Sequence, residues 1–236
     1  MRSLNSTVYL IPCFLDPGAI HVIPAYILEA VKECGVFFTE NERSGRRYLK
    51  SIWKEMVIDA CEWYTIHKQE EEVKNEFRKK LSEGKTIGIL SEAGCPGVAD
   101  PGQYLVALAQ DSGALVRPLV GPNAILLALM ASGMNGQHFE FVGYLPIAIA
   151  ERVKKIRDLE NESRKKNCTQ IFIETPYRNN QLLETLLKTC NPATRLCIGA
   201  DLTGINESVR TQTIAAWKNN IPELQKKPAI FLLYAG

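Results

Sequence analysis

The chain has 236 residues with a formal net charge of +2; 46% of its residues are hydrophobic and 23% are charged. This length allows one large domain or two small ones. Because the net charge is near neutral, only a local basic patch could bind nucleic acid. The seven cysteines form no C-x-x-C pair and the three histidines have no ligand spacing, so we expect reduced thiols and no metal site. Without a membrane-length apolar run or a recognisable signal peptide, the sequence predicts a cytoplasmic protein.

The first half of the chain alternates short apolar strands with helices. Four apolar runs are typical of buried strands, at 8–14, 36–39, 86–90 and 114–120. Three helices are predicted in this half, over 24–34, 68–83 and 102–111. Gly35 is expected to end the first of them as a C-cap glycine. Continuous apolar strands in this order favour a parallel sheet covered on both faces.

The second half combines helices with strands of mixed direction. Helices are predicted over 124–133, 150–166 and 177–189, and strands over 139–145, 169–174, 195–202, 208–214 and 229–234. The alternating strand 208–214 is expected to pair with 195–202 as a hairpin. Because the pattern changes near Pro118 and Pro122, we predict an N-terminal α/β domain at 1–120 and a C-terminal α/β domain at 121–236. The first should have a parallel-rich sheet and the second a mixed sheet.

Two glycine-containing corners are the candidate binding segments. In TIGILSEAGCPGVADPG (86–102), a buried strand runs into a loop of small residues and then into a helix. In an open α/β sheet this is where a ligand crevice forms, and small residues let backbone groups approach a ligand. A second corner, VGPNA (120–124), begins a helix whose first N–H groups are free. Each corner alone could equally be a structural connection.

The most basic stretch lies at 43–54, which has five basic residues and no acidic one. It is either the solvated face of a helix or a surface that contacts phosphates, with Tyr48 and Trp53 available for stacking.

The chain has none of the common motifs for covalent catalysis or phosphate binding. G-x-G-x-x-G, the Walker phosphate loop and G-x-S-x-G are all missing, and Cys95 has no visible activating partner. Such a chain suits an enzyme that positions two reactants, and methyl transfer from an activated sulfonium donor is one such reaction.

Several segments together resemble one family. They are VYLIPC (8–13), TENER (39–43), SEAGCPGVADPG (91–102), GPNAILLALMASGMNGQHFEFVGYLP (121–146), ETPYR (174–178), GADLT, NESVR and PAIFLLYAG. In order and in sequence they resemble the tetrapyrrole-methylase-like superfamily, and within it the branch of ribosomal RNA small subunit 2′-O-ribose methyltransferases. The similarity covers nearly the whole chain, but the C-terminal extension common in that branch has no counterpart here.

The resemblance implies two α/β domains with S-adenosylmethionine (SAM) in the cleft between them, a homodimer, and ribosomal RNA as the substrate, without a metal or a membrane. It implies cofactor contacts at Pro12, Glu92, Ala93, Gly94, Cys95, Val98, Asn123, Ala124, Glu174, Ala200, Leu202 and Ala229. If RNA is the acceptor, Arg43 and Arg178 are expected to contact phosphate or ribose, and Glu40 and Glu174 to orient the reacting groups.

Three departures from the branch pattern leave the acceptor open. Cys95 stands for Thr, Asn123 for Ser and Tyr177 for His. Two alternatives therefore remain beside RNA ribose methylation. One is C-methylation of a tetrapyrrole, and the other is a module that binds SAM or RNA without catalysis.

Overall fold

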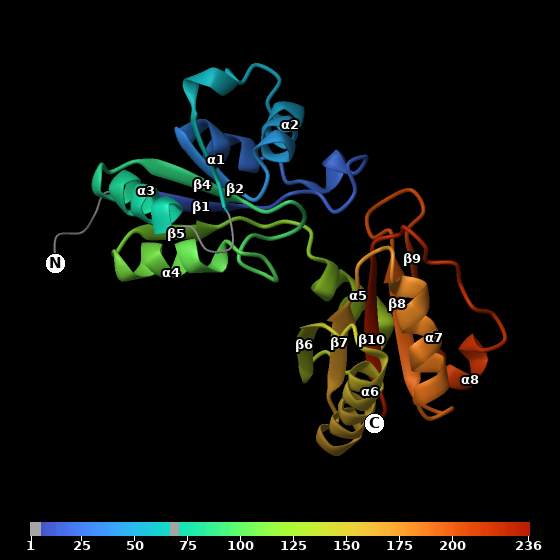
Figure 1. The fold of residues 1–236 in the computed structure, drawn as a ribbon. Helices are drawn as coiled ribbons and strands as arrows, with labels where there is room; N and C mark the ends of the chain where they lie inside the picture. The colour runs from blue at the N-terminus through green and yellow to red at the C-terminus, as the bar shows by residue number, and fades with distance from the viewer. Residues whose placement is uncertain (1–5, 67–70) are drawn as a thin grey trace. The chain divides into compact units, whose positions relative to one another are not determined.

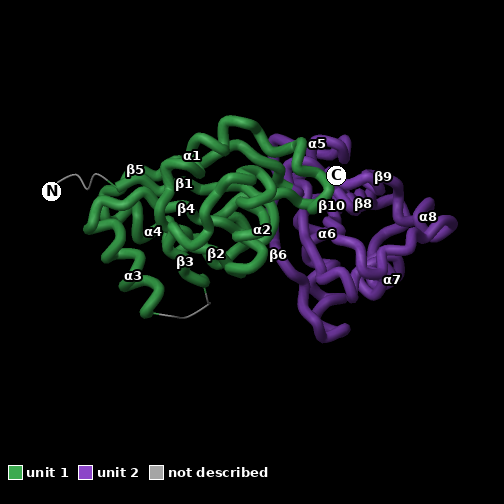
Figure 2. Tube along the Cα trace, turned by 90° about the horizontal axis from the view of Figure 1, so that it is seen from above, with its two compact units in different colours: residues 1–123 green, residues 124–236 purple. Residues whose placement is uncertain are grey.

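The computed structural model describes residues 6–66 and 71–236. The chain divides into two compact units, residues 1–123 and residues 124–236 (Figure 1, Figure 2). Each unit contains one five-stranded sheet with helices packed against it. Within the described ranges, no helix is both long enough and apolar enough to cross a membrane.

The sheet of the N-terminal unit is entirely parallel, as predicted. Its strands are β1 (Thr7–Ile11), β2 (Val36–Thr39), β3 (Glu62–Thr65), β4 (Thr86–Leu90) and β5 (Leu115–Pro118), in the order β3-β2-β4-β1-β5. Strand β3 was not predicted, because it lies at the edge of the sheet and its four residues are exposed or half-buried.

Helices cover both faces of this sheet because neighbouring strand residues point to opposite sides. The helices are α1 (Ile27–Glu33), α2 (Glu42–Ile52), α3 (Glu71–Ser82) and α4 (Gln103–Asp111), with short 3-10 turns at Ile20–Val22 and Ile58–Ala60. One core joins Tyr9 and Phe37 to α1 and α2. The other joins Val8 and Phe38 to α3 and α4.

Two details of the predicted helices differ. The predicted helix over 68–83 includes 68–70, which lie outside the described residues, and it ends before Gly84 as expected. Gly35 is not a left-handed helix cap: α1 ends with Cys34 as its C-cap, and the Gly35 N–H donates to the carbonyl of Thr86 at 3.3 Å. Gly35 therefore begins the pairing of β2 with β4.

The sheet of the C-terminal unit is mixed, as predicted. Its strands are β6 (Phe139–Tyr144), β7 (Thr169–Ile173), β8 (Arg195–Ala200), β9 (Ser208–Thr213) and β10 (Ala229–Tyr234), in the order β6-β7-β10-β8-β9. Only the β6–β7 pair is parallel, while β10 lies antiparallel to β7 and β8. The predicted hairpin of β8 and β9 is confirmed, with Ala200 opposite Ser208.

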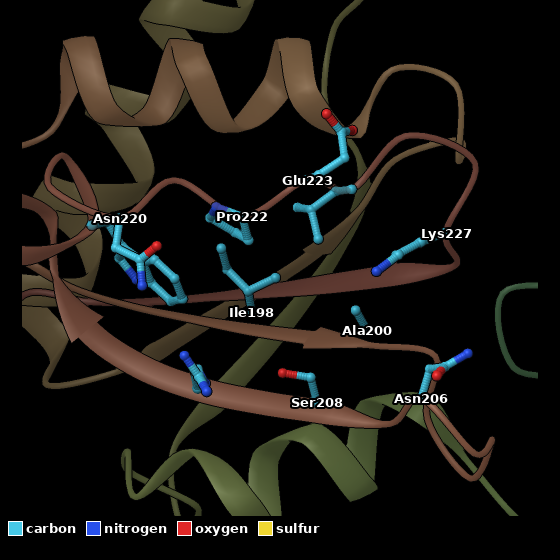
Figure 3. A pocket seen from close by; sticks show the side chains of 11 residues that line it. Ile198, Ala200, Asn206, Ser208, Asn220, Pro222, Glu223 and Lys227 are labelled. Carbon is cyan, nitrogen blue, oxygen red and sulfur yellow. The ribbon is translucent and has the colours of Figure 1, made fainter.

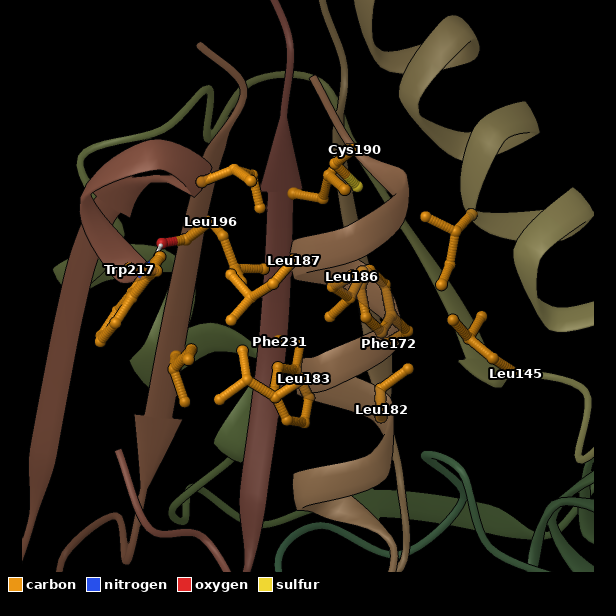
Figure 4. Packing of buried hydrophobic residues seen from close by; sticks show 14 of the residues in the cluster. Leu145, Phe172, Leu182, Leu183, Leu186, Leu187, Cys190, Leu196, Trp217 and Phe231 are labelled. Carbon is orange, nitrogen blue, oxygen red and sulfur yellow. Dashed lines mark hydrogen bonds between the residues drawn. The ribbon is translucent and has the colours of Figure 1, made fainter. Parts of the chain in front are cut away.

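Helices α6 (Ile149–Lys166), α7 (Asn179–Thr189) and α8 (Ile214–Trp217) pack on one face of this sheet, and α5 (Ala124–Ser132) packs on the other. The hydrophobic core of this unit lies under α7, whose leucines contact Phe172 and Phe231 of the sheet (Figure 4). On the opposite face, the Thr211 hydroxyl donates to the carbonyl of Ser132 at 2.8 Å. At Gly199, an added Cβ would lie 3.4 Å from the Cβ of Ala128.

Replacing Gly88 in the central strand β4 is expected to destabilise the N-terminal unit. A Cβ at Gly88 would lie 2.7 Å from Ile11 Cδ1 and 2.8 Å from Phe37 Cδ1, and both side chains are fully buried. We expect Gly88→Ala to lower the free energy of unfolding by about 1–3 kcal/mol, measured by urea titration. Gly35→Ala is the matched control, since an added Cβ there meets nothing within 4 Å. Equal midpoints for the two variants would contradict this packing.

Candidate functional site

The carboxyl ends of the parallel strands bring the predicted N-terminal site residues to one edge of the sheet. Pro12 follows β1, Glu40 follows β2, and the loop 91–102 follows β4. The segment 119–123 follows β5. Because parallel strands end at the same edge, these segments lie side by side, where open α/β sheets bind their ligands.

Hydrogen bonds fix the loop 91–102 against the end of β1. Cys13 and Gly94 form an isolated antiparallel bridge, with N···O distances of 2.8 Å and 3.1 Å. Gly94 has a φ of +73°, a left-handed conformation that glycine adopts without strain. The Ser91 hydroxyl donates to the carbonyl of Ala93 at 3.1 Å. Glu92, Ala93 and Val98 are exposed, so this loop presents both side chains and backbone to solvent.

Asp100 is a loop-forming residue whose role the sequence analysis missed. Its Oδ1 accepts hydrogen bonds from the Gly97 N–H at 2.9 Å and the Gly102 N–H at 2.8 Å. Burial raises the pKa of this carboxyl group, and the two N–H donors oppose that rise. Asp followed by Pro and Gly is typical of a turn in which the Asp side chain accepts hydrogen bonds from backbone N–H groups. This sequence could have predicted the role of Asp100.

The second corner, at 120–124, packs directly against Pro12, the residue that follows β1. A Cβ at Gly121 would lie 2.2 Å from the Cβ of Pro12, so only glycine allows this approach. The Tyr48 hydroxyl donates to the Pro12 carbonyl at 2.6 Å. Cys95 Sγ lies 3.6 Å from the Pro122 carbonyl oxygen, where the thiol can donate a weak hydrogen bond. Residues 12, 95 and 121–122 are therefore packed together.

The Cys95 thiol is protonated at neutral pH. Burial raises its pKa, although a hydrogen bond with Asn123 opposes the rise. A thiol rather than a thiolate is a poor nucleophile, in agreement with the sequence, which gave this cysteine no activating partner.

Glu40 is a half-buried carboxylate at the same edge. Its Oε1 accepts a hydrogen bond from the Glu92 N–H at 3.1 Å. Burial raises the pKa of Glu40, the Glu92 N–H lowers it, and the charges of Asp100 and Glu92 raise it further. Ser44, in the first turn of α2, donates to the Glu92 carboxylate at 3.3 Å, so α2 also contacts this loop.

Helix α2 carries the basic stretch, and one expectation about it is wrong. Tyr48 is only 3% exposed and belongs to the core, so it cannot stack on a ligand, while Trp53 is half-buried. Arg46 pairs with Glu42 and lies over the Trp63 ring at 5.2 Å from its centroid. Arg43, Arg47 and Lys50 are exposed.

The C-terminal unit holds a second set of predicted residues. Ala200 at the end of β8 lies opposite Ala229 at the start of β10, and Leu202 follows closely and is buried. The next residue pair of β10, Ile230 with Ile173 of β7, places Glu174 at the same edge. Ala124 begins α5, at the N-terminal boundary of this unit.

Glu174 and Arg178 form an ion pair between a buried carboxylate and a half-buried guanidinium. Glu174 is 4% exposed, and its Oε1 accepts from Arg178 Nη2 at 2.6 Å, Arg178 Nε at 3.0 Å and the Thr175 N–H at 2.7 Å. Among the described residues, none donates to the buried Oε2. The pair fixes the direction of the Arg178 guanidinium.

A small pocket lies beside Ala200, between the β8–β9 hairpin and the segment that contains Pro222 and Glu223 (Figure 3). Its volume is about 140 Å³. That is below the roughly 300 Å³ at which typical ligand pockets begin, so the pocket alone does not identify a cofactor site. In the ranges that the structure describes, no group of three or more His, Cys, Asp or Glu residues could hold a metal ion.

Several known proteins that share one name are similar to this chain. A protein of Xylella fastidiosa named ribosomal RNA small subunit methyltransferase I is 30% identical over 93% of this chain and 82% of that protein. Proteins of the same name from Mesorhizobium japonicum and Vibrio cholerae are 36% and 32% identical over 58% and 73% of this chain. The matches cover 45% and 60% of those two proteins, so this chain spans about half of their length. No protein-family model matches the chain.

Solved structures of two methyltransferases share the fold. The methyltransferase CobJ superposes with a TM-score of 0.61 at 17% identity, over 97% of this chain and 93% of that one. Uroporphyrin-III C-methyltransferase from Thermus thermophilus, complexed with S-adenosylhomocysteine, has a TM-score of 0.58 at 18% identity, over 97% of each chain. These likenesses confirm the predicted α/β fold with a parallel sheet and a mixed sheet.

Replacing Glu40 by Gln is expected to stabilise the fold at neutral pH. Because the folded state raises the pKa of Glu40 above its unfolded value of about 4.3, its ionised form destabilises the fold above that range. The gain in melting temperature of Glu40→Gln over wild type should be largest at pH 7 and should vanish as the pH falls to about 4. Glu55→Gln, at an exposed glutamate of the same unit, is the control. A pH-independent difference would contradict this interpretation.

Proposed function

Because the chain belongs to the ribosomal RNA small subunit methyltransferase I family, we propose that it transfers a methyl group from SAM to a ribose 2′-hydroxyl of small-subunit ribosomal RNA. The observation that carries this proposal is the similarity to the Xylella fastidiosa protein, which extends over 93% of the chain. The cytoplasm is the proposed site of action, since the proposed substrate is made there. A homodimer is proposed from the family resemblance, and light scattering of the purified chain tests it.

The residues at the carboxyl edge of the N-terminal sheet suit SAM as the donor. Ala93 is exposed and has a small side chain, so a ligand can approach its backbone, and the carbonyl oxygens of Gly121 and Pro122 can accept contacts from a cation. SAM supplies a methyl group that its sulfonium charge already activates. In the N-terminal unit the proposed cofactor contacts are Pro12, Glu92, Ala93, Gly94, Cys95, Val98 and Asn123. In the C-terminal unit they are Ala124, Glu174, Ala200, Leu202 and Ala229.

Two carboxylates have different proposed roles. Glu40 has a raised pKa and, among the residues that the structure describes, one hydrogen-bond donor, so it can orient the acceptor hydroxyl and receive its proton. Glu174 already accepts three hydrogen bonds on Oε1, so it holds Arg178 for a contact with phosphate or ribose. Arg43 is proposed to make a similar contact from α2, where its side chain is exposed.

Two measurements test the donor and the acceptor separately. We expect SAM to bind the purified chain with a micromolar or tighter Kd in calorimetry. We also expect one ribose of small-subunit RNA to lose its 2′-O-methyl group in cells that lack the protein, detected by a ribose-methylation map. Absence of SAM binding would contradict SAM as the methyl donor. An unchanged ribose-methylation map together with methylation of a tetrapyrrole would make the tetrapyrrole the acceptor. SAM binding without any methyl transfer would favour a module that binds without catalysis.

Charge reversal on α2 is expected to weaken RNA binding. Arg43 and Arg47 are exposed and one helical turn apart, whereas Arg46 is held by Glu42 and Trp63. We expect Arg43→Glu with Arg47→Glu to raise the Kd for single-stranded RNA and to reduce the slope of log K against log[salt] by about 1.4, at roughly 0.7 per lost phosphate contact.

The matched control reverses Lys154 and Lys155, which are exposed on α6. If both double variants change RNA binding equally, or neither changes it, the α2 face is an ordinary solvated helix surface.

A further inference from the structure

Two segments of the C-terminal unit that are far apart in sequence are joined into one surface. The turn at 174–178 leads into α7, and the loop 223–227 precedes β10. One hydrogen bond joins the turn to the loop, Lys226 N to Pro176 O at 2.9 Å. Three more join the first two residues of α7 to the loop: Asn179 Nδ2 to Lys227 O at 2.7 Å, Leu224 N to Asn180 Oδ1 at 2.9 Å, and Asn180 Nδ2 to Glu223 Oε1. These bonds hold the backbones of the two segments together, so the positions from which their exposed side chains extend are fixed.

The exposed side chains on this pair of segments include one aromatic ring, two lysines, Glu223 and Gln225, and half-buried Arg178 lies beside the ring in sequence. Tyr177 is 71% exposed, so its ring is accessible to a ligand. Lys226 and Lys227 are both exposed, and Arg178 is fixed on Glu174 with part of its side chain accessible. We call these four residues the 177/226 surface.

The backbone at Lys226 adds a second indication. Lys226 has a φ of +63°, a left-handed conformation that costs a residue with a side chain about 1 kcal/mol or more. The Lys226 N–H is the donor that reaches Pro176. This hydrogen bond holds Lys226 next to the residue that precedes Tyr177. A glycine could adopt the same positive φ without strain, but it would supply no positive charge.

The acidic groups nearby leave this surface positive. Glu174 is buried and already pairs with Arg178. Glu223 accepts from Asn180 Nδ2 and from the Gln225 N–H, which lower its pKa, and the charge of Lys227 lowers it further. Three cations thus face two carboxylates, and one of those carboxylates is buried beneath the surface.

We propose that the 177/226 surface binds an unpaired stretch of the substrate RNA, with a base stacked on Tyr177 and phosphates contacted by Lys226 and Lys227. This inference rests on the proposed function and specifies how the RNA is held. An exposed ring beside cations matches the alternating bases and phosphates of a single strand, whereas a duplex hides its base faces. Because the backbone of both segments is already held, the loss of conformational entropy on binding is confined to the side chains.

The first test uses Tyr177 and compares two forms of RNA. Fluorescence anisotropy measures the Kd of the full chain for a labelled single-stranded 12-mer and for the duplex of the same sequence. Tyr177→Ala should weaken binding of the single strand about tenfold, as expected for one lost stacked base, and should leave duplex binding unchanged. Tyr177→Phe keeps the ring and should bind like wild type. Equal affinity of Tyr177→Ala and wild type for the single strand would overturn the proposal.

The second test removes the two lysine charges. Lys226→Gln with Lys227→Gln removes both charges but keeps polar, flexible side chains, and should lower the salt slope for the single strand by about 1.4. The control is Lys154→Gln with Lys155→Gln on α6, which should leave the slope unchanged. If the lysine variant loses binding to polyglutamate but keeps its RNA affinity, the surface belongs to an acidic protein partner and the proposal is wrong.

Failure of this proposal and failure of the proposed function give different results. SAM affinity, measured by calorimetry, should be the same in wild type and in all variants, which also shows that each variant is folded. If wild type binds SAM but no RNA, the RNA part of the proposed function fails and the inference fails with it. If wild type binds and methylates RNA while the variants do so equally well, only the 177/226 surface is wrong.

Discussion

The shared direction of the five N-terminal strands is the constraint on which the candidate site depends. Parallel pairing places the residues after β1, β2, β4 and β5 at one edge, although they are more than 100 residues apart in sequence. The bridge between Cys13 and Gly94 then fixes the loop 91–102 beside Pro12. A slip of the β1–β4 register would separate these segments, and the buried alternation of Val8 and Tyr9 between two cores opposes such a slip.

Two carboxylates show how the surroundings separate chemical roles within one protein. Glu174 is enclosed and accepts three hydrogen bonds on one oxygen, so its charge is used within the fold. Glu40 is half-buried with one N–H donor, and its pKa is raised. Glu40 has capacity left for another molecule at a raised pKa, whereas Glu174 directs one oxygen at Arg178 and leaves its buried Oε2 without a donor among the described residues.

Much of the fold was predictable because its strands are buried apolar runs that end at glycine, proline or charged residues. Strands β2, β4 and β10 have the predicted bounds. Edge strand β3 lacks that signal, since Glu62 and its neighbours are exposed or half-buried. The burial of Tyr48 was unpredictable because its hydroxyl meets the Pro12 carbonyl across 36 residues. The contacts of the 177/226 surface likewise depend on antiparallel pairing of β10 with β7, which no local pattern contains.

The half-buried thiol of Cys95 has a practical consequence. It lies 3.6 Å from the Pro122 carbonyl oxygen, and its raised pKa keeps it protonated at neutral pH. Alkylation of Cys95 is therefore slow, because only the small thiolate fraction reacts. A ligand that covers the loop 91–102 and the corner at 121–122 would slow alkylation further, so the rate of modification reports occupancy of this edge whether or not any methyl group is transferred.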